Sequence, residues 1–291
     1  MRSLILTIPV LLLASFAAFG QDSASIHQSH KEAMTFAAPG QDWAKERVDK
    51  SRRHQEWAKV KNGAREVNSF VVYPEVKGKA TAVVVIHEIF GLSDWVRSVA
   101  DQLAEAGYIA IAPDLLSGMG PNGGGSSAFT DRSGITQAVL KLPPDQVKGD
   151  LNAVADYVSK LPACNGKVAV AGFCWGGSQT FLLATNREKL AAAFVFYGSG
   201  PESADAIARI KAPVYGFYGG MDGRIGATVP KSQELMKAAG KAYEPVTYEG
   251  AGHGFMRSGE DPGPTNDPNA EANKKARTEA WGRWKALLKK L

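Results

Sequence analysis

Six short apolar runs, separated by segments of helical length, constrain the fold of this chain more than any other feature of its sequence. The runs lie at residues 82–86, 108–112, 168–171, 192–196, 214–218 and 245–248. Helical spacing of apolar residues is found at 94–106, 144–160, 177–185, 230–239 and 270–291. Near-continuous apolar strands that alternate with helices are typical of a parallel sheet covered by helices. The sequence therefore predicts an α/β fold with a mostly parallel, doubly wound sheet.

A β-hairpin is expected ahead of the parallel strands. Residues 56–60 and 65–73 have the composition of strands, and Lys61-Asn62-Gly63 lies between them. Asn-Gly is a preferred pair in tight hairpin turns because both residues tolerate positive φ. We therefore expect an N-terminal antiparallel hairpin at one side of the sheet.

The first twenty residues have the pattern of a secretory signal peptide. Arg2 is followed by a largely apolar stretch at 4–13, and Ala18 and Gly20 supply the small residues of a cleavage site. A membrane anchor is the alternative, but a span needs ~20 apolar residues and this run is interrupted. We expect a signal peptide at 1–20, a polar leader or added helix at 21–53 and one domain at 54–291. The mature protein would be periplasmic or secreted.

Charge and composition point to a small-molecule ligand. The 291 residues carry a formal net charge of +5, which weakly favours an anionic substrate. Lysine and arginine form no dense stripe, so a nucleic-acid partner is not expected. We expect a monomer that has no membrane partner once the signal is cleaved, and that needs neither a metal nor a cofactor.

The run Gly172-Phe173-Cys174-Trp175-Gly176-Gly177 lies between a predicted strand and a predicted helix. This is the context of a nucleophile elbow, G-x-S-x-G, with cysteine in the place of serine. The positive end of the following helix would favour thiolate. The alternative is a buried structural cysteine, which is a common location for this residue type. The other cysteine, Cys164, would lie roughly 30 Å away along an extended strand, so Cys174 is expected to be a free thiol.

Two further residues complete a candidate catalytic triad. Asp222 follows the run at 214–218, and His253 follows the run at 245–248. The order nucleophile, acid, histidine is that of the α/β-hydrolase fold, and loops at the carboxyl ends of parallel strands lie along one edge of a sheet. Taken singly, Asp222 would be a turn residue and His253 a loop histidine. His87 also ends a predicted strand, but we interpret it as structural.

An oxyanion hole is expected from the backbone N–H groups of Ile89 and Trp175, because this fold takes one donor from the loop after an early strand. That loop reads His87-Glu88-Ile89-Phe90-Gly91. Two glycine- and proline-rich stretches, 117–127 and 259–269, also follow strands, where open α/β sheets bind their ligands. Each is either an active-site lid or a flexible surface loop.

From residue 54 to the C-terminus, the chain resembles the dienelactone hydrolase family. The loop His87–Gly91, the elbow at Cys174, Asp222 and Ala251-Gly252-His253 carry the resemblance. It implies that Glu88 interacts with the thiol and keeps it protonated until substrate displaces this carboxylate, which then helps to deprotonate it. It further implies that Arg257 and Arg132 bind a carboxylate of the substrate. Glu88 could instead be a solvated loop residue, and either arginine a surface residue.

These features predict a hydrolase of lactones or small esters that carry a carboxylate, working through Cys174, His253 and Asp222 and an acyl-enzyme. Acyl transfer or peptide hydrolysis at the same site is one alternative. A non-catalytic ligand-binding module on a hydrolase scaffold is another. A thiol redox sensor at Cys174 is the third, although no resolving cysteine lies within range.

Overall fold

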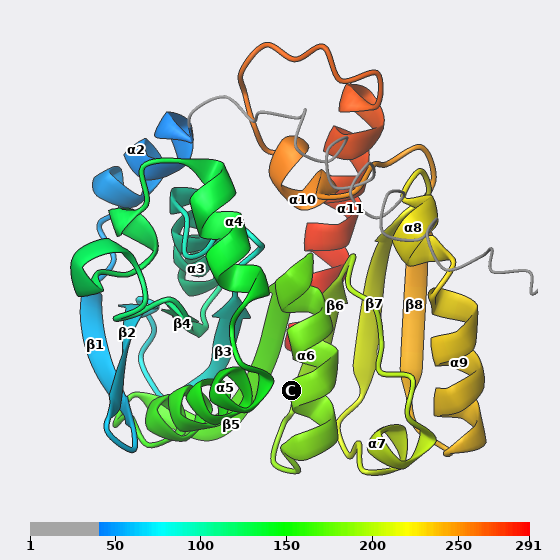
Figure 1. Ribbon diagram of the computed structural model, residues 1–291, viewed down its shortest axis with the longest axis horizontal. Coiled ribbons are helices and arrows are strands. Elements are labelled where there is room, and N and C mark those ends of the chain that lie inside the picture. The colour runs from blue at the N-terminus through cyan, green and yellow to red at the C-terminus, as the bar shows by residue number, and fades with distance from the viewer. Residues whose placement is uncertain (1–40) are drawn as a thin grey trace, which may run out of the picture. The chain divides into compact units, whose positions relative to one another are not determined.

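The computed structural model describes residues 41–291, and within them one eight-stranded sheet runs in the order β1-β2-β4-β3-β5-β6-β7-β8 (Figure 1). The strands are β1 (Gln55–Asn62), β2 (Arg65–Val72), β3 (Ala80–Ile86), β4 (Ile109–Pro113), β5 (Cys164–Phe173), β6 (Ala192–Phe196), β7 (Val214–Gly219) and β8 (Tyr243–Tyr248). The predicted hairpin is β1–β2, and β2 also pairs antiparallel with β4. All other pairings are parallel. The predicted mostly parallel α/β sheet is confirmed.

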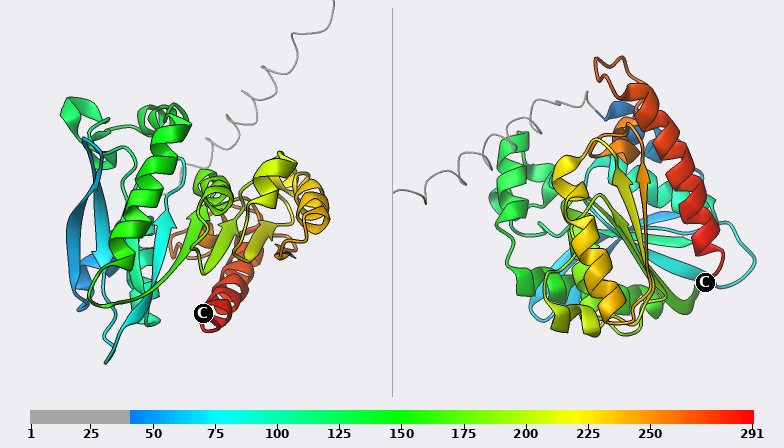
Figure 2. Two further views of the ribbon diagram at one scale, coloured as in Figure 1. Left: turned by 90° about the horizontal axis from the view of Figure 1, so that it is seen from below. Right: turned by 90° about the vertical axis from the view of Figure 1, so that its right-hand side faces the viewer.

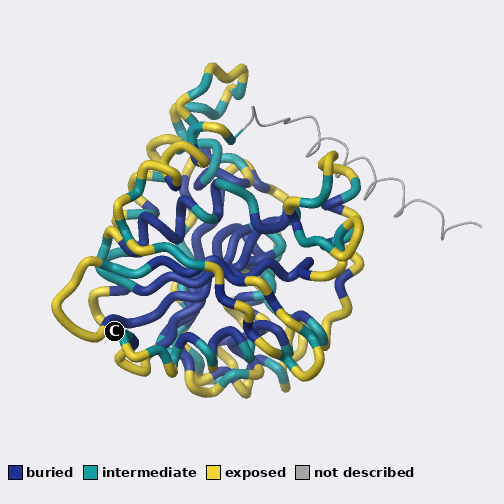
Figure 3. Tube along the Cα trace, turned by 90° about the vertical axis from the view of Figure 1, so that its left-hand side faces the viewer, coloured by how far each residue is buried: buried dark blue, intermediate teal, exposed yellow. Residues whose placement is uncertain are grey.

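The sheet is buried on both faces, which explains why its central strands are apolar throughout. Every residue of β3, β4 and β6 is buried. One face packs against α4 (Arg132–Leu140), α5 (Pro144–Ser159), α6 (Trp175–Asn186) and α9 (Val229–Ala238). The other packs against α2 (Asp42–Lys50), α3 (Asp94–Glu105) and α11 (Ala270–Leu288). Figure 2 shows α11 in red on the opposite side from α9 in yellow, and Figure 3 shows the buried strands inside an exposed periphery.

The structured unit begins before the predicted domain boundary at residue 54. Helix α2 buries Ala44 and Val48 in the same apolar cluster as α3. Beyond α2, the Arg53 guanidinium donates to both carboxylate oxygens of Asp101, at 2.9 and 2.7 Å. Of the predicted segment 21–53, the structure describes residues 41–53, and these contain helix α2. This helix packs into the core of the domain. The predicted signal peptide at 1–20 lies outside the described residues.

Short helices complete the connections after the strands. They are two 3₁₀ turns at Pro121–Gly123 and Ser126–Ala128, and the helices α7 (Ala204–Ala208), α8 (Gly223–Gly226) and α10 (Phe255–Ser258). Both cysteines are free, as expected, because Cys164 begins β5 and Cys174 directly follows the other end of that strand. No helix within residues 41–291 is long and apolar enough to cross a membrane.

Candidate active site

Cys174 occupies a sharp turn between β5 and α6. Its backbone has φ 56° and ψ −118°, a conformation that L-residues with side chains rarely adopt. The turn is tight enough that a Cβ atom on Gly176 would lie 2.4 Å from the carbonyl oxygen of His87. A residue with a side chain could not occupy position 176 without moving the neighbouring strand. Strand, strained residue and helix together form the geometry of a nucleophile elbow.

The structure brings Cys174, His253 and Asp222 into one line of contacts. His253 Nε2 lies 3.1 Å from Cys174 Sγ, and His253 Nδ1 lies 2.5 Å from Asp222 Oδ2. Asp222 is held in place because its Oδ1 accepts a hydrogen bond from the N–H of Ile225 at the start of α8. These contacts cross 79 and 31 positions of the sequence. The parallel strands make them possible, because their carboxyl ends meet along one edge of the sheet.

The charges around His253 oppose the effect of its burial. Burial alone would lower its pKa, but negative charge on Cys174 and the hydrogen bond to Asp222 raise the pKa to about 10. Burial would likewise raise the pKa of Asp222, and the hydrogen bond to His253 outweighs it, so this pKa is lowered. The arrangement can therefore hold an imidazolium between a sulfur and a carboxylate.

Tyr197 is a site residue that the sequence analysis missed. It follows β6 directly, is fully buried and has a positive φ of 40°. Its ring packs edge-on against His253, with the ring centroids 5.1 Å apart. It thereby limits the rotation of the imidazole. Its position at the carboxyl end of a parallel strand was the signal that could have found it.

Glu88 makes a different contact from the one implied by the resemblance. Its Oε2 accepts a hydrogen bond from Arg257 Nε at 2.8 Å, and both side chains are largely buried. Among the described residues, the hydrogen-bond partner of the Cys174 sulfur is His253, so the implied role of Glu88 beside the thiol stays a prediction. A buried carboxylate is stabilised by the charge-assisted hydrogen bond of a guanidinium, which explains the pairing with Arg257.

Arg132 lies close to this ion pair. Its guanidinium and that of Arg257 lie 5.3 and 5.5 Å from the centroid of the Phe90 ring. Burial lowers the pKa of Arg132, and the positive charge of Arg257 lowers it further. The two arginines thus flank one aromatic ring, close enough to repel each other. An anion in addition to the Glu88 carboxylate, bound between the two guanidinium groups, would be stabilised by the positive charge of both.

The loop that follows β3 carries Glu88 and Ile89 and is closed by hydrogen bonds. The Gly91 N–H donates to the Glu88 carbonyl at 3.2 Å, and the Leu92 N–H donates to Ser126 Oγ at 2.9 Å. Gly91 has φ 68°, and a Cβ there would lie 2.3 Å from Ser126 Oγ, so only glycine fits. The glycine-rich segment 117–127 therefore contacts the predicted oxyanion loop through Ser126.

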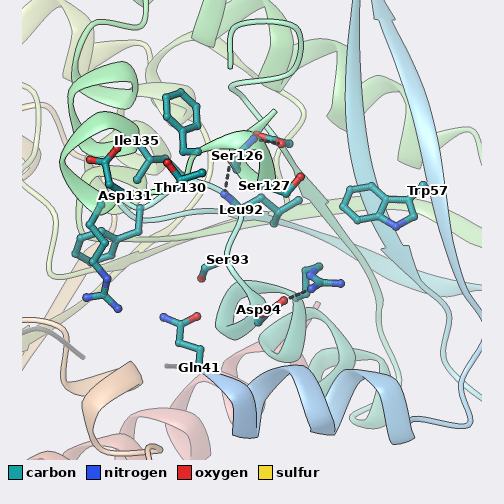
Figure 4. A pocket seen from close by; sticks show the side chains of 15 residues that line it. Gln41, Trp57, Leu92, Ser93, Asp94, Ser126, Ser127, Thr130, Asp131 and Ile135 are labelled. Carbon is teal, nitrogen blue, oxygen red and sulfur yellow. Dashed lines mark hydrogen bonds and ion pairs between the residues drawn. The ribbon is translucent and has the colours of Figure 1, made fainter. Parts of the chain in front are cut away.

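A cavity of about 480 Å³ opens beside this loop (Figure 4). Phe90 and Arg132 line it and also contact or flank the Glu88–Arg257 pair, which joins the cavity to the site. The remaining wall is mostly polar and includes Gln41, Trp57, Ser93, Asp94, Arg97, Ser127, Thr130 and Asp131. The segment 117–127 contributes to this wall, whereas the second stretch, 259–269, does not. Among residues 41–291, no cluster of His, Cys, Asp and Glu has the geometry of a metal site.

Comparisons with known proteins identify the family of the chain. The model of the dienelactone hydrolase family matches residues 67–291. A Methylorubrum extorquens protein provisionally named carboxymethylenebutenolidase is 34% identical over 200 residues, covering 65% of this chain and 68% of that protein. A Saccharolobus solfataricus protein of the same provisional name is 29% identical over 263 residues, covering 78% and 95%. A crystal structure from Klebsiella pneumoniae, provisionally assigned as a dienelactone hydrolase, has 26% identity and a TM-score of 0.70, covering 83% of this chain and 100% of that one.

A mostly parallel sheet with an antiparallel hairpin, helices on both faces and an elbow after β5 define an α/β-hydrolase. Within that class, the chain belongs to the dienelactone hydrolase family. It is a hydrolase of carboxylic esters or lactones.

Proposed function

We propose that this protein hydrolyses lactones or small esters that carry a carboxylate, with Cys174 as nucleophile, His253 as general base and Asp222 as its orienting acid. The observation that carries the proposal is the continuous line of contacts, 3.1 Å from sulfur to imidazole and 2.5 Å from imidazole to carboxylate. Nucleophile, base and orienting group at hydrogen-bond distance are what acyl transfer requires.

In the first half of the reaction, the proton of the Cys174 thiol passes to His253 Nε2, where the raised pKa of the imidazole holds it, and the thiolate sulfur attacks the carbonyl carbon. The carbonyl oxygen becomes an oxyanion that accepts hydrogen bonds from the N–H groups of Ile89 and Trp175. The C–O bond then breaks, and His253 returns its proton to the leaving alkoxide. In the second half, His253 takes a proton from water, which attacks the thioester and releases the acid and the thiol.

The two arginines support a substrate that carries its own carboxylate. Arg257 is paired with Glu88, and Arg132 lies on the same Phe90 ring. A substrate carboxylate would compete with Glu88 for Arg257 and would be attracted by Arg132 as well. Glu88 would then be released near the thiol, where its charge can assist deprotonation.

Two cysteine variants test the mechanism. Cys174→Ala should abolish turnover of lactones and test esters. Cys164→Ala is the matched control, because Cys164 is buried at the far end of β5 and should leave turnover unchanged. Hydrolysis by Cys174→Ala at the wild-type rate would disprove the proposed nucleophile.

The carboxylate preference is tested with pairs of lactones that differ only in a carboxylate. Arg257→Ala should lose the preference for the anionic member of each pair. Arg52→Ala, which removes an exposed arginine, should keep it. An unchanged preference in Arg257→Ala would remove this residue from the substrate site.

We further propose that the enzyme acts in the periplasm or outside the cell, because residues 1–20 have the pattern of a signal peptide. We also propose that it acts there as a monomer. Cell fractionation should place the mature chain outside the cytoplasm with Gln21 at its N-terminus. Full-length protein in the cytoplasm would contradict export. Sedimentation at the mass of a dimer would contradict the monomer.

A further inference from the structure

His87 is a buried histidine that the proposed triad does not use. It follows β3 immediately and none of its surface is exposed. Among the described residues, the hydrogen bond to the sulfur comes from His253 and not from His87. Burying a polar ring without a hydrogen-bond partner costs free energy, so the hydrogen bonds of His87 indicate what the residue does.

The partner of His87 is the peptide group that contains a predicted oxyanion donor. His87 Nδ1 lies 2.7 Å from the carbonyl oxygen of Glu88. A carbonyl oxygen only accepts, so Nδ1 carries the proton and donates. That carbonyl and the N–H of Ile89 belong to one peptide plane. No described peptide bond is cis, so the N–H of Ile89 points away from the carbonyl that His87 holds.

His87 also contacts the residue that supplies the second predicted donor. Its imidazole stacks on the Trp175 indole, with ring centroids 5.5 Å apart and an interplanar angle of 14°. The backbone carbonyl of His87 faces Gly176 at the start of α6, where a Cβ would lie 2.4 Å away. One residue therefore contacts both sides of the predicted oxyanion hole.

We propose that His87 is a positioning residue, which orients the Glu88–Ile89 peptide so that its N–H points at the developing oxyanion. This inference rests on the proposed function, because it assigns a role within the same reaction. The Gly91 N–H donates to the same Glu88 carbonyl at 3.2 Å, so the peptide is held by two donors. Hydrogen bonds accepted by a carbonyl also polarise its peptide, which strengthens the opposite N–H as a donor.

The surroundings of His87 favour the neutral form of its ring, in which Nδ1–H is the donor that this role needs. Burial lowers the pKa of His87, and this effect exceeds the opposing influence of the Glu88 carbonyl and of Asp114 and Glu88. Nε2 has no hydrogen-bond partner within residues 41–291. A second proton on the ring would therefore be buried without an acceptor, so the Nδ1–H tautomer is the favoured form.

Two substitutions separate the hydrogen bond from the packing of the ring. His87→Phe keeps an aromatic ring against Trp175 but removes the donor. His87→Asn loses the ring, but its side-chain amide can place an N–H where Nδ1 stands. The measurement is kcat/KM for an ester and for its thionoester, in which sulfur replaces the carbonyl oxygen. Sulfur is a weak hydrogen-bond acceptor, so the N–H groups of the oxyanion hole stabilise the transition state of the thionoester only slightly.

We expect His87→Phe to lower kcat/KM for the ester about tenfold, mainly through kcat, because a misaligned donor costs less than a deleted one. The kcat/KM for the thionoester should fall much less, so the ratio of kcat/KM for the ester to kcat/KM for the thionoester falls. His87→Asn should restore most of that ratio. Alkylation of Cys174 by iodoacetamide forms no oxyanion, and its rate should stay near wild type in both variants. That rate also reports whether each variant is folded at the site.

Equal losses for ester and thionoester in His87→Phe would overturn the proposal, because a general loss of active protein affects both substrates alike. A low ratio in an alkylation-competent His87→Asn would also overturn it, because the donor would then not be the feature that matters. Failure of the wild type to hydrolyse any ester would instead refute the proposed function itself. The two failures are therefore distinguishable.

Discussion

At the scale of single residues, the reactive position is also a strained one. Cys174 has a positive φ, and such a conformation costs a residue with a side chain of order 1–3 kcal/mol. The surrounding structure holds it there, because β5 and α6 are fixed by the packing of both sheet faces. The elbow could be predicted from the sequence, since its glycines and its place between strand and helix are local features.

Replacing Cys174 by glycine should reveal this strain. Relative to Cys174→Ala, Cys174→Gly should be more stable by about 1 kcal/mol, because glycine adopts positive φ without a steric penalty. In a chain of this size, the melting temperature should rise by roughly 2–4 °C. Both variants lack the thiol and should be inactive. A lower melting temperature for the glycine variant would show that the turn is not strained.

Asp222 should contribute a pH-dependent stability. Its pKa is lowered in the folded protein, so its contribution is present above the ordinary value of 3.8 and is lost as the pH falls through the folded value. Asp222→Asn should cost about 2 kcal/mol near neutral pH, and the gap to wild type should narrow at acid pH. Asparagine can still cap Ile225, so the cap is conserved. Urea unfolding across this pH range measures the gap, and a constant gap would contradict the assignment.

The same substitution should slow ester hydrolysis by about 10⁴-fold, because the wrong histidine tautomer would face the thiol. A rate within tenfold of wild type would remove Asp222 from the triad.

At the scale of elements, the segments that could be predicted were those with a strong apolar period. The strands and the helices α3, α5, α6, α9 and α11 were predicted in this way. Helix α4 was not predicted from the sequence, because Gly134 lies in its first turn and its apolar face is short. The pairing of Glu88 with Arg257 could not be derived either, since these residues are 169 positions apart and only the fold brings them together.

Helix α2 is linked to the site through Glu260, which lies three positions after Arg257. The Glu260 carboxylate accepts from Arg47 on α2 at 2.9 Å, from Gln102 and Trp95 on α3 at 2.7 and 3.1 Å, and lies 3.1 Å from Arg277 on α11. Three helices therefore hold the segment that follows α10.

Glu260→Ala should destabilise the protein by about 3 kcal/mol, because it leaves buried donors without their acceptor. Arg47→Ala removes a half-exposed partner and should cost about 0–1 kcal/mol. Lys50→Ala, on the exposed side of the same helix, is the control. Chemical unfolding measures the free energy of unfolding of all three variants.

Glu260→Ala should also raise KM for anionic lactones more than for neutral ones, because the segment that carries Arg257 is then held less firmly by the surrounding helices. A loss of stability with unchanged selectivity would confine Glu260 to a structural role.

At the scale of the whole molecule, the hairpin and the loop after β4 line the cavity beside the active site, which the catalytic residues themselves do not line. Trp57 on β1 lines the cavity and is 57% exposed, although most large apolar side chains of the described residues are buried. Phe90 lies at the end of the cavity that adjoins the Glu88–Arg257 pair. We expect the cavity to accept the part of a larger ester that extends past Phe90, with Trp57 as its apolar contact.

Trp57→Ala should therefore act according to substrate size. For acetate-sized esters, kcat/KM should stay within about twofold of wild type, because such substrates do not reach Trp57. For esters with a ring-bearing group, the loss of aromatic contact should lower kcat/KM by about fivefold, equivalent to about 1 kcal/mol. Met221→Ala, which removes another exposed apolar side chain outside the cavity wall, should change neither value. Equal effects of Trp57→Ala on small and large esters would show that substrates do not enter this cavity, because only a bound group that spans it can sense its far wall.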